Sequence, residues 1–191
     1  MAPSTVRDPP DDEADRWLVD RVARGHPEAF EVLLRRHQVR IHRIALRMLG
    51  DTQDAEDVSQ DVALQLWRAL AAFSGSATFS TWLYRLVVNR CLDHRRSDRR
   101  RREATRPLRD TDTPATRIGP EQRAVGAARL RAATTALTAL PDEQRAALVL
   151  FQVEGLPYRE VAAVLQVSEP AVRSRIERAR GNLMVAMRDW A

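Results

Sequence analysis

The chain has 191 residues, enough for one medium-sized domain or two small ones. Hydrophobic residues make up 44% of it and aromatic residues only 5%, and the predominance of Ala, Leu and Val favours helices. The longest segment without a charge, residues 69–84, contains Gly75 and several Ser and Thr, so no transmembrane helix is expected. Cys91 is the one cysteine, which excludes an internal disulfide and fits a reducing cytoplasm.

The N-terminal part of the chain predicts three helices after a short leader. Residues 1–14 lack the apolar core of a signal peptide and are expected to form a disordered leader. Apolar residues then recur at helical spacing up to Gly50, a residue favoured just past a helix end. Asp51 starts a second helix, and a third runs from about Phe79 into an arginine run. The predicted buried stripe of the second helix is Ala55, Val58, Val62, Leu66 and Trp67.

Positive charge is concentrated around the third helix and the segment that follows it. Residues 71–109 carry 10 Arg against 3 acidic residues, and a concentrated basic block is typical of a surface that binds a phosphate backbone. Residues 104–120 contain three Pro and one Gly, a composition typical of a flexible linker. A second helical region follows, with breaks near Pro141 and Gly155. We therefore expect an all-α protein of two small helical domains, residues 15–103 and 121–191, on a tether.

The segment from Tyr158 onward predicts a helix-turn-helix motif. A first helix, Tyr158–Leu165, is expected to bury Val161, Ala162 and Leu165. Gln166 occupies a tight turn where Gly is common, at a cost of roughly 1 kcal/mol if the backbone is left-handed. Ser168 can cap the second helix.

The second helix of this motif has an apolar and a polar side. Val172, Ile176, Ala179 and Leu183 fall in a stripe about 60° wide, and the opposite side presents Arg173, Ser174, Glu177 and Arg178. Such a helix enters the major groove of duplex DNA by its N-terminus. The competing interpretation is an ordinary helical hairpin with solvated arginines.

One side of the third helix, beside Arg85, combines an aromatic ring, an amide and arginines. Thr78, Trp82, Asn89 and Arg96 lie on one side, and the residues on the other side, Phe79, Leu83, Leu86, Val87, Cys91 and His94, have the character of a core. Stacking on an aromatic ring together with Arg and amide donors suits unpaired bases. The alternative is a solvated helix face with one tryptophan at its boundary.

Acidic and amide residues gather at the start of the second helix: Asp54, Asp57, Gln60 and Asp61. They could bind a divalent metal, but acidic residues in a first helical turn are also favoured by the helix dipole. We interpret them as a polar surface that docks a partner protein. Cys91 and His94 lack the two further ligands of a zinc site. With no nucleophilic triad, catalytic carboxylate pair or phosphate-binding loop, we expect no enzyme activity, metal or cofactor.

Taken together, these motifs resemble the extracytoplasmic-function group of bacterial RNA polymerase sigma factors. Region 2 of that group is similar to residues 54–61, 66–68 and 73–89, and region 4 is similar to residues 140–145, 155–162 and 172–180. The resemblance covers residues 17–188 apart from the linker. One departure is Pro170-Ala171, where the family usually has Gly-Thr.

The resemblance implies a promoter-specificity subunit that works in the cytoplasm and is restrained by an anti-sigma factor. Core RNA polymerase would contact the acidic surface around Asp57. The loop from Phe73 through Ser74 to Thr78, with the side of the third helix near Arg85, would hold an unpaired base of the −10 element. The second helix of the motif would read the −35 element in duplex promoter DNA through Arg173, Ser174, Glu177 and Arg178, and we expect Arg180 to contact phosphate.

Two other classes of protein remain open on the residues alone. One is a transcription regulator with a C-terminal helix-turn-helix, although residues 1–103 show no βαβ pattern of a receiver domain. The other is a metal-dependent nucleic-acid enzyme that uses Asp54, Asp57 and Asp61. Activity that is lost with a chelator would support the enzyme, and polymerase-dependent transcription from a promoter would exclude both classes.

Overall fold

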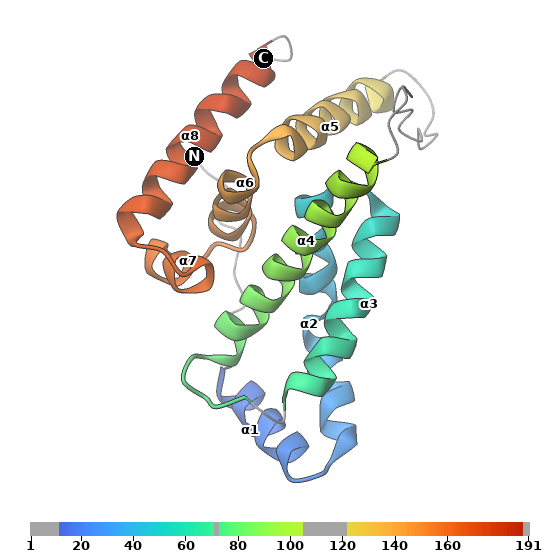
Figure 1. The fold of residues 1–191 in the computed structure, drawn as a ribbon, viewed down its shortest axis with the longest axis vertical. Coiled ribbons are helices and arrows are strands. Elements are labelled where there is room, and N and C mark those ends of the chain that lie inside the picture. The colour runs from blue at the N-terminus through green and yellow to red at the C-terminus, as the bar shows by residue number, and fades with distance from the viewer. Residues whose placement is uncertain (1–11, 71–72, 105–121, 189–191) are drawn as a thin grey trace.

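The structure, a computed structural model, describes residues 12–70, 73–104 and 122–188. Within these ranges the fold is all-α, as predicted, and the helices form two groups that pack against each other (Figure 1). None of the described helices combines the length and hydropathy needed to cross a lipid bilayer.

The N-terminal group is a bundle built around its second helix, which contacts the other three. Its members are α1 (Asp12–Ala23), α2 (Pro27–Leu49), α3 (Thr52–Ala69) and α4 (Phe79–Ala104). Gly50 ends α2 in the left-handed conformation, with φ of 80°, and its N–H donates to the carbonyl of Leu46. The Asp51 side chain accepts from the N–H of Asp54 and caps α3. Both helix ends are where the sequence predicts them.

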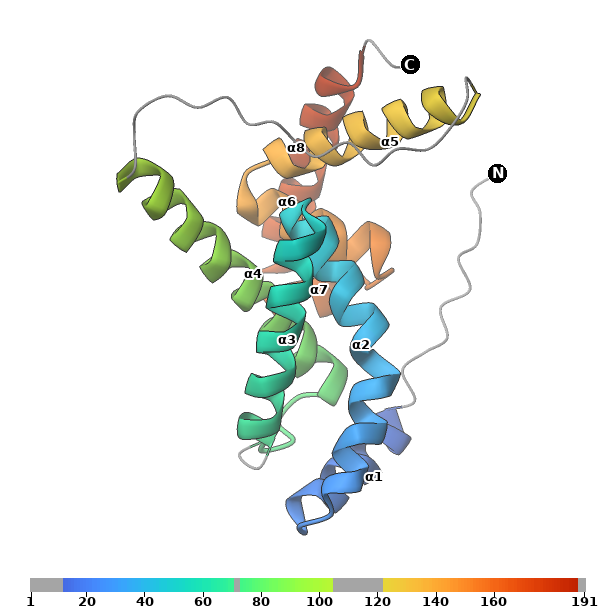
Figure 2. The same ribbon diagram turned by 90° about the vertical axis from the view of Figure 1, so that its right-hand side faces the viewer.

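The C-terminal group contains the predicted helix-turn-helix. Its members are α5 (Gln122–Ala139), α6 (Asp142–Leu148), a π-helical turn η2 (Val149–Val153), α7 (Tyr158–Leu165) and α8 (Glu169–Ala186). Helix α8 packs on α6 and α7 (Figure 2). The breaks fall at Pro141 and Gly155, as the sequence indicates.

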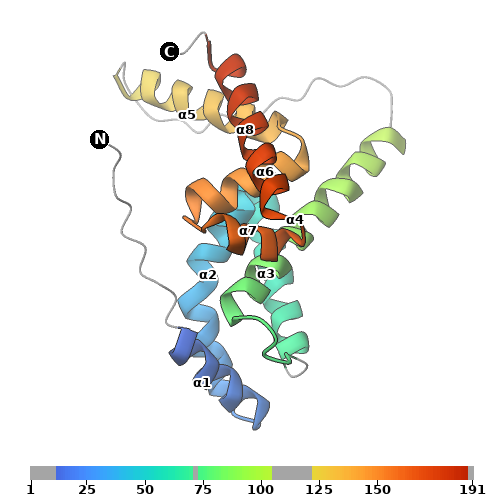
Figure 3. The same cartoon turned by 90° about the vertical axis from the view of Figure 1, so that its left-hand side faces the viewer.

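The two groups share one continuous hydrophobic core. Buried side chains of α2, α3 and α4 belong to the same cluster as those of α6, η2, α7 and α8. Helix α7 lies against α4, and α2 contacts both α5 and η2 (Figure 3). The expected linker, residues 104–120, lies outside the described residues except for Ala104, the last residue of α4.

Three details differ from the sequence predictions. Trp67 is 48% exposed, because it follows Leu66 around α3 and leaves the buried stripe; it contacts Phe30 edge-on, at 4.8 Å between ring centroids. In α7, Val164 is buried and Leu165 only half-buried, since α7 packs against α4 as well as α8. Helix α1 begins at Asp12, inside the expected leader, whose residues 1–11 lie outside the described residues.

Candidate functional site

The turn between α7 and α8 sets the direction of the second helix. Gln166 adopts the left-handed conformation, with φ of 55°, so a non-glycine residue does occupy this turn. The Ser168 side chain accepts from the N–H of Ala171 at 3.4 Å and caps α8. Val172, Ile176 and Ala179 are buried against the core and Leu183 is half-buried. These contacts fix which side of α8 faces solvent.

The outward side of α8 carries the predicted −35 residues. Arg173, Ser174, Glu177, Arg178 and Arg180 are all exposed. Arg178 donates through Nε to the carbonyl of Ser174 at 3.2 Å, and Arg180 donates to Oε1 of Gln152 at 3.1 Å. Arg175, the residue after Ser174, is instead mostly buried and pairs with Glu143 at 2.6 Å. The helix therefore presents one polar row to solvent.

Two aromatic rings that the sequence pattern did not indicate as functional lie beside this row. Tyr158, at the start of α7, stacks on Phe151 of η2, with ring centroids 4.7 Å apart and an interplanar angle of 20°. The Cζ atom of Arg173 lies 4.5 Å from the Tyr158 centroid, and that of Arg180 lies 5.6 Å from the Phe151 centroid. The rings belong to η2 and α7, not to α8, so the residue spacing within α8 gave no signal for them.

The predicted −10 residues begin in a loop that is joined to α4 by an aromatic cluster. Ser74 is exposed and donates to the hydroxyl of Ser76. Thr78 accepts the N–H of Thr81 at 3.2 Å, which satisfies one donor at the start of α4. Trp82 is half-buried, and its ring lies 5.2 Å from that of Phe73 and 5.9 Å from that of Phe79.

Further along α4, the predicted residues lie in different surroundings. Asn89 is exposed, and Arg96 is exposed with an ion pair to Asp93 at 3.2 Å. Arg85 donates through Nη2 to the carbonyl of Ala163 in α7, at 2.8 Å. The C-terminal group therefore covers α4 at Arg85 and leaves Asn89 open.

The acidic surface of α3 divides between solvent and α4. Asp57 and Gln60 are exposed, whereas Asp61 accepts from Nε of Arg90 at 3.1 Å. Asp54 lies 3.6 Å from Nε2 of His94, and one ligand atom each of Asp54, His94 and Asp98 lie within 4.8 Å of one another. Partial burial raises the pKa of Asp54, and His94 opposes that rise.

Cys91, the one cysteine of the chain, is shielded from solvent. Its side chain belongs to the buried core, as predicted, and burial raises the pKa of the thiol to about 12. A thiol with such a pKa is almost entirely protonated near neutral pH and is therefore a poor nucleophile and a poor metal ligand.

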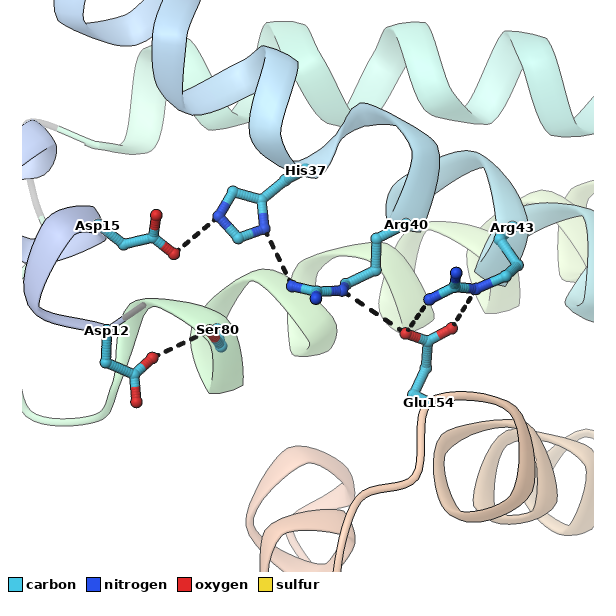
Figure 4. A network of polar contacts seen from close by, with 7 residues as sticks. All are labelled: Asp12, Asp15, His37, Arg40, Arg43, Ser80 and Glu154. Carbon is cyan, nitrogen blue, oxygen red and sulfur yellow. Dashed lines mark hydrogen bonds and ion pairs between the residues drawn. The ribbon is translucent and has the colours of Figure 1, made fainter. Parts of the chain in front are cut away.

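A buried carboxylate joins the two helix groups (Figure 4). Glu154, whose side chain is 1% exposed, accepts from Nε and Nη2 of Arg43 at 2.8 and 2.7 Å, and its hydrogen bonds raise the pKa of that guanidinium. Nε of Arg40 lies 3.7 Å from Oε2 of the same carboxylate, and Nη1 of Arg40 lies 3.3 Å from Nδ1 of His37. His37 in turn contacts the buried carboxylate of Asp15 in α1, at 2.7 Å.

Two other contacts strengthen this junction. Arg145 of α6 is fully buried and donates to the carbonyl of Met48 in α2 at 2.6 Å. Arg95 of α4 pairs with Asp142 of α6 at 2.6 Å. None of these residues was predicted as functional, because each pair is brought together only when the two groups pack.

Comparison with known proteins gives matches to both groups. The model of Sigma-70 region 2 matches residues 33–101, and that of Sigma-70 region 4 matches residues 130–183. The ECF RNA polymerase sigma factor SigM of Mycobacterium tuberculosis is 37% identical over 172 residues, which cover 90% of this chain and 84% of SigM.

Two solved structures have the same arrangement of helices. CnrH, in complex with the cytosolic domain of CnrY, is similar with a TM-score of 0.69 and 29% identity, over 93% of this chain and 99% of CnrH. The sigma factor RpoE of Bartonella quintana, in complex with the anti-sigma factor NepR, has a TM-score of 0.66 and 21% identity, over 83% of this chain and 96% of RpoE, and shares the fold.

Proposed function

The chain belongs to the extracytoplasmic-function (ECF) group of bacterial RNA polymerase sigma factors, and from this membership we propose how its parts divide the work of promoter recognition. It is a transcription initiation factor, not an enzyme. We assign residues 15–103 to region 2, residues 104–120 to the tether and residues 121–191 to region 4. The observation that carries the proposal is the helix-turn-helix of α7 and α8, whose exposed polar row is held outward by a buried apolar stripe.

Region 4 reads the −35 element as duplex DNA through α8. Arg173 lies in the first turns of the helix, where a helix-turn-helix reaches base edges, and Ser174, Glu177 and Arg178 line the same exposed side. Arg180 lies further from the groove entrance and contacts phosphate. If Arg173 spans a guanine, Arg173→Ala costs about 1–3 kcal/mol and relaxes the preference at one base position. A phosphate contact would instead weaken binding to all sequences, with a smaller salt slope.

Region 2 holds an unpaired base of the −10 element against the loop and α4. Trp82 supplies a ring and Asn89 an amide, flanked by Ser74, Thr78, Arg85 and Arg96. The exposure of Asn89 and Arg96 supports this assignment. Since Arg85 donates to Ala163 of α7 in the free chain, this arginine becomes available to DNA only when α7 moves away from α4.

Core RNA polymerase docks on the acidic surface of α3. Asp57 and Gln60 are exposed and can meet a basic partner helix directly. Asp54 and Asp61 flank them and also contact His94 and Arg90 of α4, so they join the docking surface to the DNA-binding helix.

An anti-sigma factor holds the chain inactive in the cytoplasm by stabilising the closed arrangement. Support comes from the two similar structures, each of which is a complex, one of them with an anti-sigma factor. The closed packing of α7 on α4 is an arrangement that such a partner can bind.

Run-off transcription with core polymerase tests the proposal. We expect a promoter-specific transcript only when chain and core enzyme are both present, with no dependence on a metal bound by the chain. The free chain is expected to bind duplex DNA weakly, because residues 1–70 carry 13 acidic residues against 10 Arg. A specific gel shift by the free chain at nanomolar concentration in moderate salt would contradict it.

A further inference from the structure

Two aromatic rings, one from η2 and one from α7, contact arginines on the outward side of α8. We call Phe151 and Tyr158 the aromatic pair. Phe151 comes from η2 and Tyr158 from α7, and both are only half-buried, so they lie at the surface of the core. Their near-parallel stacking places one arginine of α8 beside each ring: Arg173 beside Tyr158, and Arg180 beside Phe151.

Arg173 is held in a different way from the neighbouring arginines. Arg175 has an ion pair with Glu143, and Arg178 donates to a backbone carbonyl. Among the residues that the structure describes, Arg173 makes neither a hydrogen bond nor an ion pair, and its contact is the face of Tyr158. A cation above an aromatic face is held by the ring quadrupole, which leaves the N–H donors of the guanidinium free.

The two arginines that contact the aromatic pair lie on the same side of α8. Positions 173 and 180 are seven residues apart, which is close to two turns and a rise of about 10 Å along one side of α8. Each of the two arginines lies beside one ring of the stacked pair. An aliphatic side chain in place of either ring would offer no aromatic face to a cation.

We propose that Tyr158 is a positioning residue for promoter recognition. Its ring, supported by Phe151, holds the Arg173 side chain over the outer side of α8, ready for a base edge, while Phe151 does the same for Arg180 at the phosphate backbone. Restricting a flexible side chain before binding lowers the entropy lost on binding. The inference rests on the proposed −35 role of Arg173 and adds Tyr158 as the residue that orients the Arg173 side chain before DNA binds.

The test compares Tyr158→Leu, Tyr158→Phe, Arg173→Ala and the double variant Tyr158→Leu/Arg173→Ala, each in the holoenzyme. Binding is measured to promoter DNA with every single-base change in the −35 element, at two salt concentrations. Tyr158→Phe keeps the ring and is expected to match the unaltered protein. Tyr158→Leu is expected to lose about two- to fivefold, the range of an exposed cation–π contact, at the base position that depends on Arg173. The double variant is expected to equal Arg173→Ala.

A second measurement on the free, full-length chain covers the case in which Tyr158→Leu disturbs folding. Protons of the Arg173 side chain that lie over a ring have NMR signals displaced by its ring current. That displacement is expected in the unaltered chain and in Tyr158→Phe, and to be lost in Tyr158→Leu. Its absence from the unaltered chain would overturn the inference.

The two proposals fail in different ways. If Arg173→Ala changes −35 recognition but Tyr158→Leu does not, or if the effects of the two changes multiply, the positioning role is wrong and the proposed function stands. Equal losses in Tyr158→Phe and Tyr158→Leu also overturn the positioning role. If Arg173→Ala changes nothing, the −35 contact itself is wrong and the positioning role falls with it.

Discussion

Arg145 completes the ends of two helices with a single side chain. The last carbonyls of an α-helix have no partner within the helix and form the negative end of its dipole. The Arg145 guanidinium donates to Leu137 and Leu140 at the end of α5, at 2.8 and 2.7 Å, also to Thr138, and to Met48 near the end of α2. Burial lowers the pKa of Arg145 to about 10, so it stays charged at neutral pH.

Replacing Arg145 is expected to destabilise the protein strongly. Arg145→Leu leaves several buried carbonyls without donors, at a cost of about 3 kcal/mol or more in the free energy of unfolding. Arg145→Lys keeps the charge and costs less, although one ammonium cannot reach carbonyls on two helices. Denaturant unfolding followed by circular dichroism measures both.

Arg131→Leu is the matched control for this experiment, since Arg131 is an exposed arginine of α5. Its effect is expected to stay within about 0.5 kcal/mol. If Arg145→Leu and Arg131→Leu unfold at the same denaturant concentration, Arg145 does not have the bridging role that its hydrogen bonds indicate.

Among whole elements, α4 passes through three environments along its length. Its first turns pack in an aromatic cluster with Phe73, and its next turn is covered by α7 at Arg85. Beyond that, Asn89 faces solvent, and the helix continues into the arginine run. One helix therefore carries both a covered and an open part of the proposed −10 surface.

Asn89→Ala is expected to separate strand opening from folding. Asn89 is exposed and Ala is the better helix former, so stability should stay the same or rise by about 0.5 kcal/mol. Transcription from closed duplex promoters should fall and the −10 preference should change, while a template already opened at −10 loses less. Gln65→Ala, at an exposed amide on α3, is the control. Normal transcription from every promoter tested would show that this side of α4 does not hold the base.

The ends of the elements follow from local chemistry, and for this reason the sequence predicts them well. The Asp51 and Ser168 caps, Gly50 and the apolar spacing of α8 act within a few residues of one another. Contacts between the two groups have no such local signal. Glu154 and Arg43 are 111 positions apart, and only the packing of η2 on α2 brings them together.

For the candidate site, residue type and helical spacing were enough to predict exposure on α8. They did not predict that α7 would cover Arg85 or that the aromatic pair would lie under Arg173, because both depend on a neighbouring element. The exposure of Trp67 was also not predicted from its residue type. A tryptophan favours burial, but the position of Trp67 on α3 leaves it half-exposed.

Across the whole molecule, the free chain is closed, with region 4 packed on region 2. Glu154, Arg145 and Arg95 each make a polar contact across the junction, and α7 covers α4 (Figure 4 shows the Glu154 contacts). The proposed −10 surface is therefore partly covered by the group that we propose to read −35, and on that proposal the two groups must separate before both elements can be bound.

The two partners of the Arg43–Glu154 pair are expected to respond unequally to substitution. Arg43 is 45% exposed and can turn to water, whereas the Glu154 carboxylate is 1% exposed. Arg43→Ala removes both hydrogen bonds of this buried carboxylate, leaves it the longer ion pair with Arg40 and should cost about 2 kcal/mol, while Glu154→Gln removes the buried charge and should cost less than about 1 kcal/mol. Both should increase the population of separated halves, Arg43→Ala more so.

Cysteines introduced at the exposed positions 65 in α3 and 184 in α8 can each carry a fluorescent label. The distance between the two labels would then report the separation of the two helix groups. Cys91 is buried and its thiol has a raised pKa, so it should not take the label. Arg35→Ala, an exposed arginine of α2 paired with Glu31 one turn away, is the control and should leave the distance unchanged. Greater opening in Glu154→Gln than in Arg43→Ala would contradict this account of the pair.

The hydrophobic core that runs through both groups also determines how the molecule melts. Two domains joined only by a tether would absorb heat in two steps. Here the buried side chains of α2, α3 and α4 share one cluster with those of α6, α7 and α8, so neither group can lose its packing without exposing the other. In a calorimeter the free chain should show one peak, with equal calorimetric and van't Hoff enthalpies. Although it is built from two helix groups, the closed protein is therefore expected to unfold as a single cooperative unit.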